Sequence, residues 1–251
     1  MDPKGRTALI SGGTSGLGLA AARQLVARGA NVAVLGLGPV ADTARSLGPD
    51  VLGIEADITD PNAVEAALDH VVDRFGALHI TVNTAGVMIP VPILKDDGSP
   101  DDASSLRTMV EVNLLGTYRV ITHSVAAMLR NPLEDGERGV VVNTSSIAAF
   151  DGTTGQAGYA ATKAALLAMA LPMAREFAGR GIRVNTVAPG GFDTPMTAGL
   201  PSEFVDAVSK QILNPQRLGR PQECAAMILA LIENTYANAA VIRLDGGYRM
   251  T

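Results

Sequence analysis

Short apolar runs alternate along the chain with longer stretches in which apolar residues recur every three or four positions. A continuous run of Val, Ile, Leu and Ala favours a strand buried on both faces of a sheet, whereas the longer spacing favours a helix with one buried face. The runs that predict strands are residues 6–11, 31–35, 51–56, 79–83, 140–144, 183–188 and 240–244. The stretches that predict helices are residues 17–28, 61–75, 103–129, 157–178 and 221–232.

This alternation predicts an α/β fold, a single-domain doubly wound parallel sheet (Rossmann fold) with helices on both faces, because strand–helix–strand crossovers are right-handed. No linker or repeat interrupts residues 1–251, so we expect one domain. Its dinucleotide-binding half would cover about residues 1–130, and its catalytic and substrate half about residues 131–251. Residues 87–102, 131–138 and 189–202 are typical of loops. The first and third of these loops follow strands, so we expect them beside the functional site.

Composition narrows the classes of function. The 251 residues are 47% hydrophobic and 18% charged, as in a globular protein, and the formal charge of −5 disfavours nucleic acid as a partner. One cysteine, Cys224, and three dispersed histidines exclude an internal disulfide and predict no metal site. No apolar run suggests a membrane span, and the first residues do not resemble a targeting sequence. We expect a cytoplasmic protein that binds no membrane.

A glycine-rich turn separates the first predicted strand from the first predicted helix. Glycines at such a position allow a tight turn and close approach of a pyrophosphate, and the helix N-terminus offers free N–H groups to the phosphates. The candidate dinucleotide-binding residues there are Gly12, Ser15, Gly16, Leu17 and Gly18. An ordinary glycine turn is the alternative, and the strand–turn–helix context favours the dinucleotide.

The end of the second predicted strand bears on the choice between NAD and NADP. An acid about 20 residues after the glycines would bind the 2′-hydroxyl of NAD, yet Gly36 stands at that position. No Arg or Lys stands at Thr14, Ser15, Leu37 or Gly38 to pair with the 2′-phosphate of NADP. Because a buried phosphate without a cation is costly, whereas a hydroxyl can bind backbone or water, we expect NAD, with NADP not excluded.

Three polar residues in the second half of the sequence predict acid–base chemistry. Tyr159 and Lys163 lie four residues apart, on one face of a predicted helix. The ammonium and the positively charged nicotinamide ring would both lower the phenol's pKa, so that Tyr159 could exchange a proton with a carbonyl or hydroxyl oxygen. Ser146, at the end of the fifth predicted strand, could hydrogen-bond the same oxygen. Ser145 is the alternative for this role. On their own, these residues would be ordinary surface groups.

Together these motifs resemble the short-chain dehydrogenase/reductase family. The spacing Gly-x-x-x-Gly-x-Gly, the 13 residues from Ser146 to Tyr159, and Asn113 as a fourth member all match that family. The resemblance implies that Asn113 holds a water linked to Lys163, and that Tyr159 and Lys163 also contact the cofactor. It implies further cofactor contacts at Asp57, Ile58, Asn83, Thr84, Ala85, Gly86, Pro189, Phe192 and Thr194. Asp60 fits a helix cap before Pro61 better than Asp57 does.

A narrower resemblance is to the type 2 3-hydroxyacyl-CoA dehydrogenases. It rests on residues 138–155, 171–190, 217–221 and 241–250. It implies NAD-dependent interconversion of 3-hydroxyacyl-CoA and 3-oxoacyl-CoA, a place in fatty acid metabolism, a homotetramer, and Gln156 as a substrate contact beside Ser146 and Tyr159. The alternatives are an NADPH-dependent steroid or small-ketone reductase and a non-catalytic, cofactor-binding scaffold. The presence of both Tyr159 and Lys163 disfavours the scaffold.

Overall fold

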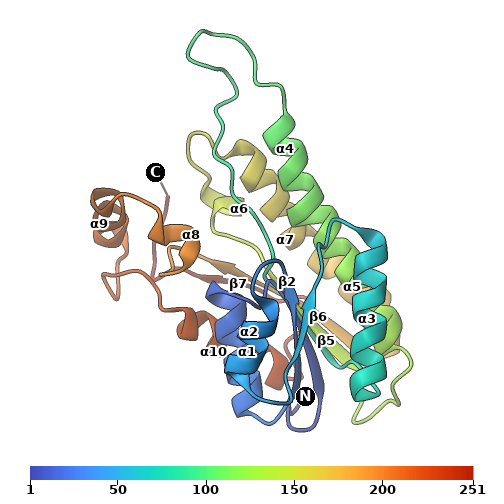
Figure 1. Cartoon of the computed structure of the whole chain (residues 1–251). Helices are drawn as coiled ribbons and strands as arrows, with labels where there is room; N and C mark the ends of the chain where they lie inside the picture. Colours follow the sequence, from blue (N-terminus) through green and yellow to red (C-terminus); the bar gives the residue numbers. More distant parts are fainter. Residues whose placement is uncertain (251) are drawn as a thin grey trace.

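One parallel sheet forms the centre of the protein (Figure 1). The computed structural model describes residues 1–250, with Phe204 described by its backbone alone. Over these residues the sheet has seven strands in the order β3-β2-β1-β4-β5-β6-β7. The strands are β1 (Thr7–Ser11), β2 (Asn31–Gly36), β3 (Leu52–Glu55), β4 (Ile80–Asn83), β5 (Gly139–Thr144), β6 (Ile182–Pro189) and β7 (Val241–Leu244). Every predicted strand is present, so the predicted fold class is confirmed.

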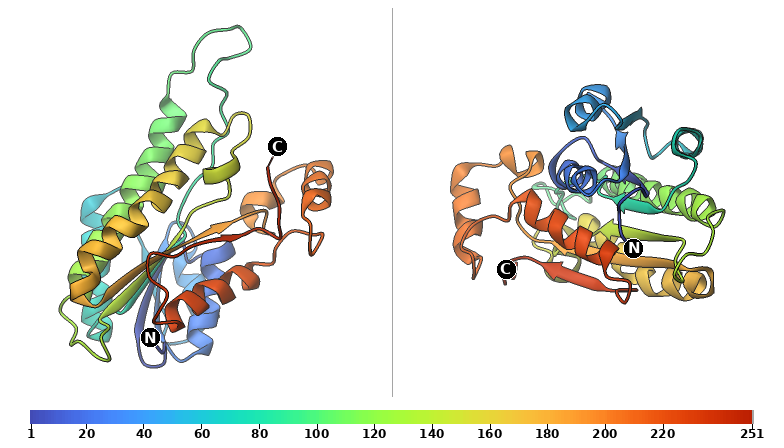
Figure 2. Two further views of the ribbon diagram at one scale, coloured as in Figure 1. Left: turned by 180° about the vertical axis from the view of Figure 1, so that it is seen from behind. Right: turned by 90° about the horizontal axis from the view of Figure 1, so that it is seen from below.

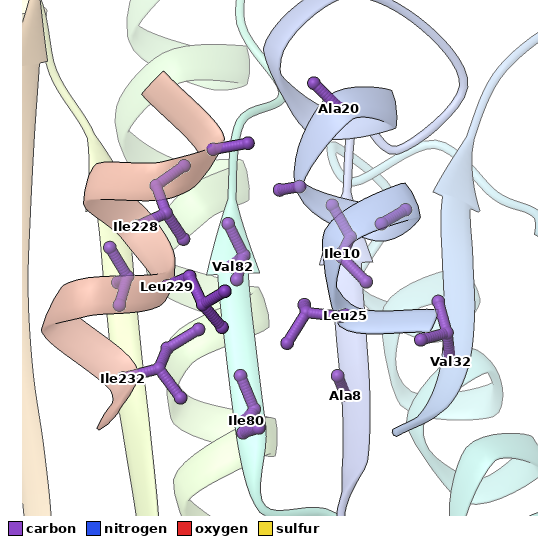
Figure 3. Packing of buried hydrophobic residues seen from close by; sticks show 14 of the residues in the cluster. Ala8, Ile10, Ala20, Leu25, Val32, Ile80, Val82, Ile228, Leu229 and Ile232 are labelled. Atoms are coloured by element: carbon purple, nitrogen blue, oxygen red, sulfur yellow. The ribbon is translucent and has the colours of Figure 1, made fainter. Parts of the chain in front are cut away.

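Helices cover both faces of this sheet, as two views from different sides show (Figure 2). One face carries α1 (Gly16–Ala27), α2 (Val40–Leu47) and α10 (Pro221–Glu233), and the other carries α3 (Pro61–Phe75), α5 (Thr117–Met128) and α7 (Ala157–Phe177). Successive strand residues supply the two cores in turn, since side chains alternate across a strand. Ala8 and Ile10 pack with α1 and α10 (Figure 3), while Leu9 between them packs in the opposite core.

The predicted helical segment over residues 103–129 is confirmed, but its interior is π-helical and not α-helical. The structure has α4 (Ser104–Met109), then a π-helical segment η1 (Val110–Gly116), and then α5. A π-helical turn contains one extra residue per turn, and apolar spacing alone does not distinguish it from an α-helix. Asn113, one of the predicted catalytic residues, lies within η1.

Four further helices were not predicted. They are α2, α6 (Ala148–Asp151), α8 (Pro195–Ala198) and α9 (Ser202–Gln211); a 3-10 turn, η2 (Ala178–Arg180), follows α7. The predicted loop over residues 189–202 therefore ends at Thr194, where a capping box with Thr197 starts α8. Short helices of this kind are held by caps and tertiary contacts and show little apolar periodicity.

One described stretch, Ala157–Arg180, is long and apolar enough to cross a membrane by length and composition, contrary to the expectation from sequence. It comprises α7 and η2. Its buried residues, including Leu166 and Phe177, lie against the rest of the protein. A core helix has this same composition, so the stretch is weak evidence for a membrane span.

Two segments extend beyond the carboxyl ends of the strands (Figure 1). The loop of residues 87–103 projects far above the sheet before it enters α4, and α8 with α9 lies on the other side. Both segments follow strands, β4 and β6 respectively. They border the region in which the predicted functional residues gather.

Candidate functional site

A cleft of about 420 Å³ lies at the carboxyl ends of the strands. It spans the point between β1 and β4 where the strand order reverses, which is where open α/β sheets bind ligands. Of the predicted site residues, the cleft is lined by Gly12, Ser15, Gly16, Leu17, Gly18, Asp57, Ile58, Thr84, Ala85, Gly86, Ser146, Tyr159, Lys163, Pro189, Phe192 and Thr194. Asn83, Asn113 and Gln156 lie outside this lining.

The glycine-rich turn packs too closely on its surroundings to admit side chains. Gly12 has a φ of +71°, and a Cβ there would lie 2.6 Å from the backbone nitrogen of Ala85. A Cβ on Gly18 would overlap the carbonyl oxygen of Gly12 and the hydroxyl of Thr84. Helix α1 begins at Gly16, and its N-cap residue, Ser15, makes no side-chain cap. The N–H groups of the first turn thus lie beside the cleft, as phosphate binding requires.

Gly36 ends β2 at the edge of the cleft. A Cβ built there would lie 3.4 Å from the side chain of Thr14, within a tight but ordinary contact distance. In the described part of the chain, Lys163 is the only cation that lines the cleft. The neighbouring acid, Asp57, is exposed and accepts a hydrogen bond from the N–H of Thr59, while Asp60 caps α3 as expected.

Asn83 belongs to a chain of side-chain hydrogen bonds across the sheet. The hydroxyl of Ser11 donates to Oδ1 of Asn83 at 3.0 Å, and Nδ2 of Asn83 donates to Oδ1 of Asn143 at 2.9 Å. All three side chains are buried. These hydrogen bonds join the carboxyl ends of β1, β4 and β5. Asn83 therefore holds together the strands that border the cleft, and the side chain of Asn83 does not line the cleft.

Tyr159, Lys163 and Ser146 meet on one wall of the cleft. Tyr159 and Lys163 are 7% and 4% exposed, and the ammonium lies 5.9 Å from the centre of the phenol ring. Burial raises the pKa of the Tyr159 hydroxyl, while its hydrogen bond with Ser146 acts to lower it. In the protein alone this pKa lies above its ordinary value, because burial has a larger effect than the hydrogen bond with Ser146; the predicted lowering by Lys163 together with a bound nicotinamide ring stays a prediction.

Lys163 is itself affected by its surroundings. Burial lowers the pKa of its ammonium to about 8. Its Nζ donates a hydrogen bond of 3.0 Å to the backbone carbonyl of Thr144, at the end of β5. This contact directs the lysine into the cleft from its helix, α7.

The two neighbouring serines have separate roles. The hydroxyl of Ser145 is buried and donates to the carbonyl of Lys163 at 2.7 Å. Ser146 is partly exposed, and its Oγ accepts a hydrogen bond from the N–H of Ala148 at 3.1 Å. Its hydroxyl also hydrogen-bonds with the phenol of Tyr159, which lines the same cleft. Both serines touch the cleft, but this geometry supports Ser146 over Ser145 for the substrate-facing role.

Asn113 is fully buried behind Gly86. Its Oδ1 accepts from the N–H of Val87 at 2.7 Å, and its Nδ2 donates to the carbonyl of Val87 and to the hydroxyl of Thr162. A Cβ on Gly86 would lie 3.0 Å from Oδ1 of Asn113 and 3.2 Å from Nζ of Lys163. The side chain of Asn113 therefore fixes the start of the loop of residues 87–103 next to Lys163.

The segment after β6 closes the cleft against the glycine-rich turn. A Cβ on Gly16 would lie 3.5 Å from Cβ of Thr194, so the two segments nearly touch. Phe192 is buried against Gly219, whose N–H donates to the carbonyl of Gly191. The predicted cofactor residues on both sides of the cleft thus face one another.

Gln156 lies at the start of α7, away from the cleft lining. Its Oε1 accepts from the N–H of Thr153 at 3.3 Å, so its side chain stabilises the turn before the helix. Cleft-lining residues that sequence reasoning did not assign to the site include Thr14, Leu37, Val112, Met196 and Thr197. Met196 and Thr197 belong to α8, and only the recognition of that short helix would have indicated them.

Comparisons with known proteins agree with this geometry. A family model described as Enoyl-(Acyl carrier protein) reductase matches residues 12–249. A relative from Drosophila melanogaster, 3-hydroxyacyl-CoA dehydrogenase type-2, is 42% identical, and the match covers 98% of each chain. The Homo sapiens protein of the same name is 41% identical over 98% of this chain and 96% of its own. The crystal structure of the type-2 enzyme from Mycobacterium avium superposes with a TM-score of 0.94 at 36% identity, covering 98% of this chain and 97% of that one.

The chain belongs to the short-chain dehydrogenase/reductase family. It is therefore an oxidoreductase that uses a nicotinamide cofactor and a small-molecule substrate. The residues present fit such a cofactor, because the glycine cradle and the free start of α1 suit a pyrophosphate. Tyr159 and Lys163 line the same cleft.

Proposed function

We propose that the protein is an NAD-dependent dehydrogenase that interconverts 3-hydroxyacyl-CoA and 3-oxoacyl-CoA. The observation that carries this proposal is that Ser146, Tyr159 and Lys163 lie together in the cleft. The relatives that match nearly the full length of this chain are named 3-hydroxyacyl-CoA dehydrogenase type-2. The bound nicotinamide would accept or supply a hydride. The protein side chains would move the accompanying proton.

Tyr159 is the proton donor to the carbonyl oxygen in reduction and the acceptor of the hydroxyl proton in oxidation. Its raised pKa keeps the phenol protonated near neutral pH in the protein alone, which suits the donor role. Ser146 donates a hydrogen bond to the same oxygen and so orients the substrate. Lys163 lies beside both groups and connects them to the region held by Asn113, from which a water could pass protons to solvent.

The preference for NAD rests on the surroundings of Gly36. Thr14 is the nearest side chain to this position, and within residues 1–250 no arginine lines the cleft. A 2′-phosphate there would lose water without gaining a cation, whereas a 2′-hydroxyl needs only a hydrogen-bonding group. This difference supports NAD as the cofactor.

The test is the oxidation of NADH and of NADPH, in parallel, in the presence of acetoacetyl-CoA. We expect turnover with NADH. The Tyr159→Phe variant should lose on the order of 10²- to 10⁴-fold in kcat while its affinity for NADH stays the same, because only the proton donor is removed. Tyr236→Phe is a matched control, since Tyr236 is 98% exposed.

Each result bears on a separate part of the proposal. Turnover with NADPH alone would contradict the assignment of NAD. Turnover of simple ketones without turnover of the thioester would contradict the acyl-CoA substrate and leave the family chemistry intact. Full activity of Tyr159→Phe would contradict the mechanism. A homotetramer, a cytoplasmic location and a place in fatty acid metabolism stay predictions from the sequence resemblance.

A further inference from the structure

Near the end of the described chain, the polypeptide returns to the apolar group that contains Tyr159. Residues 245–250, here termed the C-terminal tail, follow β7 and rise between α6 and α9 (Figure 2). Met250 packs against the apolar group formed by Met109, Ala148 and Tyr159. It also packs against a second apolar group that contains Ile147, Ile212 and Tyr248. The tail thus lies between the segment that follows Ser146 and the end of α9.

Arg243 fixes this tail to α6. Its guanidinium makes two hydrogen bonds to the carboxylate of Asp151, one of them 3.0 Å long, and a third to Asp245. It also donates to the backbone carbonyl of Tyr248 at 2.8 Å. The N–H of Met250 donates to the same Asp151 carboxylate. A bidentate arginine contact of this kind sets orientation as well as distance.

The opposite side of the tail is fixed by backbone contacts. The carbonyl of Gly246 accepts hydrogen bonds of 3.1 Å from the N–H groups of both Leu213 and Asn214. A Cβ on Gly190, which lines the cleft, would lie 2.7 Å from Cβ of Asp245. The tail therefore connects three parts of the site, namely α6, the chain after β6 and the end of α9.

We infer that the C-terminal tail forms one wall of the acyl-binding site, with Met250 as a specificity-determining residue and Arg243 as a positioning residue. This inference rests on the proposed function for the identity of the substrate. The apolar surface beside Tyr159 also contains Met88 and Ile89, which pack against the same group as Met250. Unbranched, flexible methionines suit a surface that receives an alkyl chain.

The first test compares two substrates of different length, acetoacetyl-CoA and 3-oxodecanoyl-CoA. Met250→Ala should raise the ratio of kcat/KM for the long chain over the short chain by about 10-fold, because only the longer chain fills the space that opens. The affinity for NADH, measured by fluorescence titration, should not change. Met227→Ala is the matched control, since Met227 is half-buried on α10 in the core of the opposite face.

The second test concerns Arg243. Arg243→Lys keeps the charge and removes the forked contact, so we expect KM for acetoacetyl-CoA to rise severalfold with little change in kcat or in NADH affinity. Arg28→Lys is the control, because Arg28 pairs with Glu233 between α1 and α10. A loss of kcat and NADH affinity together would indicate general damage to the fold and would overturn the positioning role.

An unchanged length ratio in Met250→Ala would overturn the assignment of the wall. If the wild-type protein reduces neither thioester, the proposed substrate is wrong, and the same ratio is measured with 2-butanone and 2-decanone. A shift of that ketone ratio in Met250→Ala would then support the wall without the acyl-CoA assignment. A wild-type protein that reduces neither pair contradicts both proposals.

Discussion

The ammonium of Lys163 donates a hydrogen bond to the carbonyl of Thr144, and the hydroxyl of Ser145 donates back to the carbonyl of Lys163. These reciprocal contacts join the end of β5 to the middle of α7. They hold Tyr159, one helical turn before Lys163, opposite Ser146, which directly follows Ser145. The catalytic geometry therefore depends on Ser145 as a support and on Ser146 as a substrate contact.

Alanine variants should separate these two serines. Ser146→Ala should lower kcat on the order of 10²-fold, because it removes a donor to the reacting oxygen. Ser145→Ala should lower the free energy of unfolding by about 1 kcal/mol and reduce kcat much less, because it removes a buried hydrogen bond. Steady-state kinetics and urea denaturation of both variants make the comparison, and equal losses of kcat would contradict the division of roles.

Lys163 should make stability depend on pH. The folded pKa of about 8 lies below the ordinary value of 10.5, so between these values the unfolded chain holds a proton that the folded protein lacks. Relative to a variant that lacks this ammonium, the free energy of unfolding should therefore rise with pH, by about 2 kcal/mol from pH 7 to pH 9.5. Lys163→Met should lack this rise. Urea denaturation of both proteins at the two pH values measures it, and parallel changes would contradict the lowered pKa.

Gly36→Asp should increase the preference for NADH over NADPH. The backbone of Gly36 is outside the left-handed region and its Cβ position is open enough for a side chain. A carboxylate there would bind the ribose 2′-hydroxyl and repel a 2′-phosphate, so the ratio of kcat/KM should shift by about 10-fold or more. Gly179→Asp adds the same charge where no atom lies within 4 Å of the new Cβ, and it should leave the ratio unchanged.

Gly18→Ala should damage the cofactor cradle. The new methyl group would overlap two oxygen atoms, those of the Gly12 carbonyl and the Thr84 hydroxyl, so the turn must shift. We expect a loss of about 1 to 3 kcal/mol in stability and weaker binding of NADH. Gly179→Ala meets no neighbour and provides the control. Wild-type affinity and stability in Gly18→Ala would show that the turn is less constrained than its geometry indicates.

The strands and most of the site could be predicted because their signals are local. Buried parallel strands have continuous apolar sequences, as in residues 140–144. The spacing from Ser146 to Tyr159 supports the prediction that both residues are catalytic. The π-helical turn at Asn113 and the capped helix α8 leave no comparable periodicity. Sequence reasoning likewise placed Asn83 and Gln156 in the site, although their side chains bond within the protein.

The pKa of Tyr159 illustrates a different limit. The spacing of four residues to Lys163 predicts a lowered pKa of the Tyr159 phenol, since an ammonium favours phenolate. Burial of the pair has the larger effect, and it lowers the pKa of the lysine as well. Burial depends on the packing of α7 against the rest of the fold, and a local motif does not contain that information.

The hydrogen bonds from Ser11 through Asn83 to Asn143 cross the boundary at which the chain was expected to divide into two functional halves. β4 is the last strand of the first half and β5 the first strand of the second, and they are adjacent in the sheet with bonded side chains. A fragment cut near residue 130 would expose an unpaired amide and a bare strand edge to water. Exchange of the substrate half between related enzymes would thus require a compatible amide at position 143, because the two halves share one buried chain of hydrogen bonds.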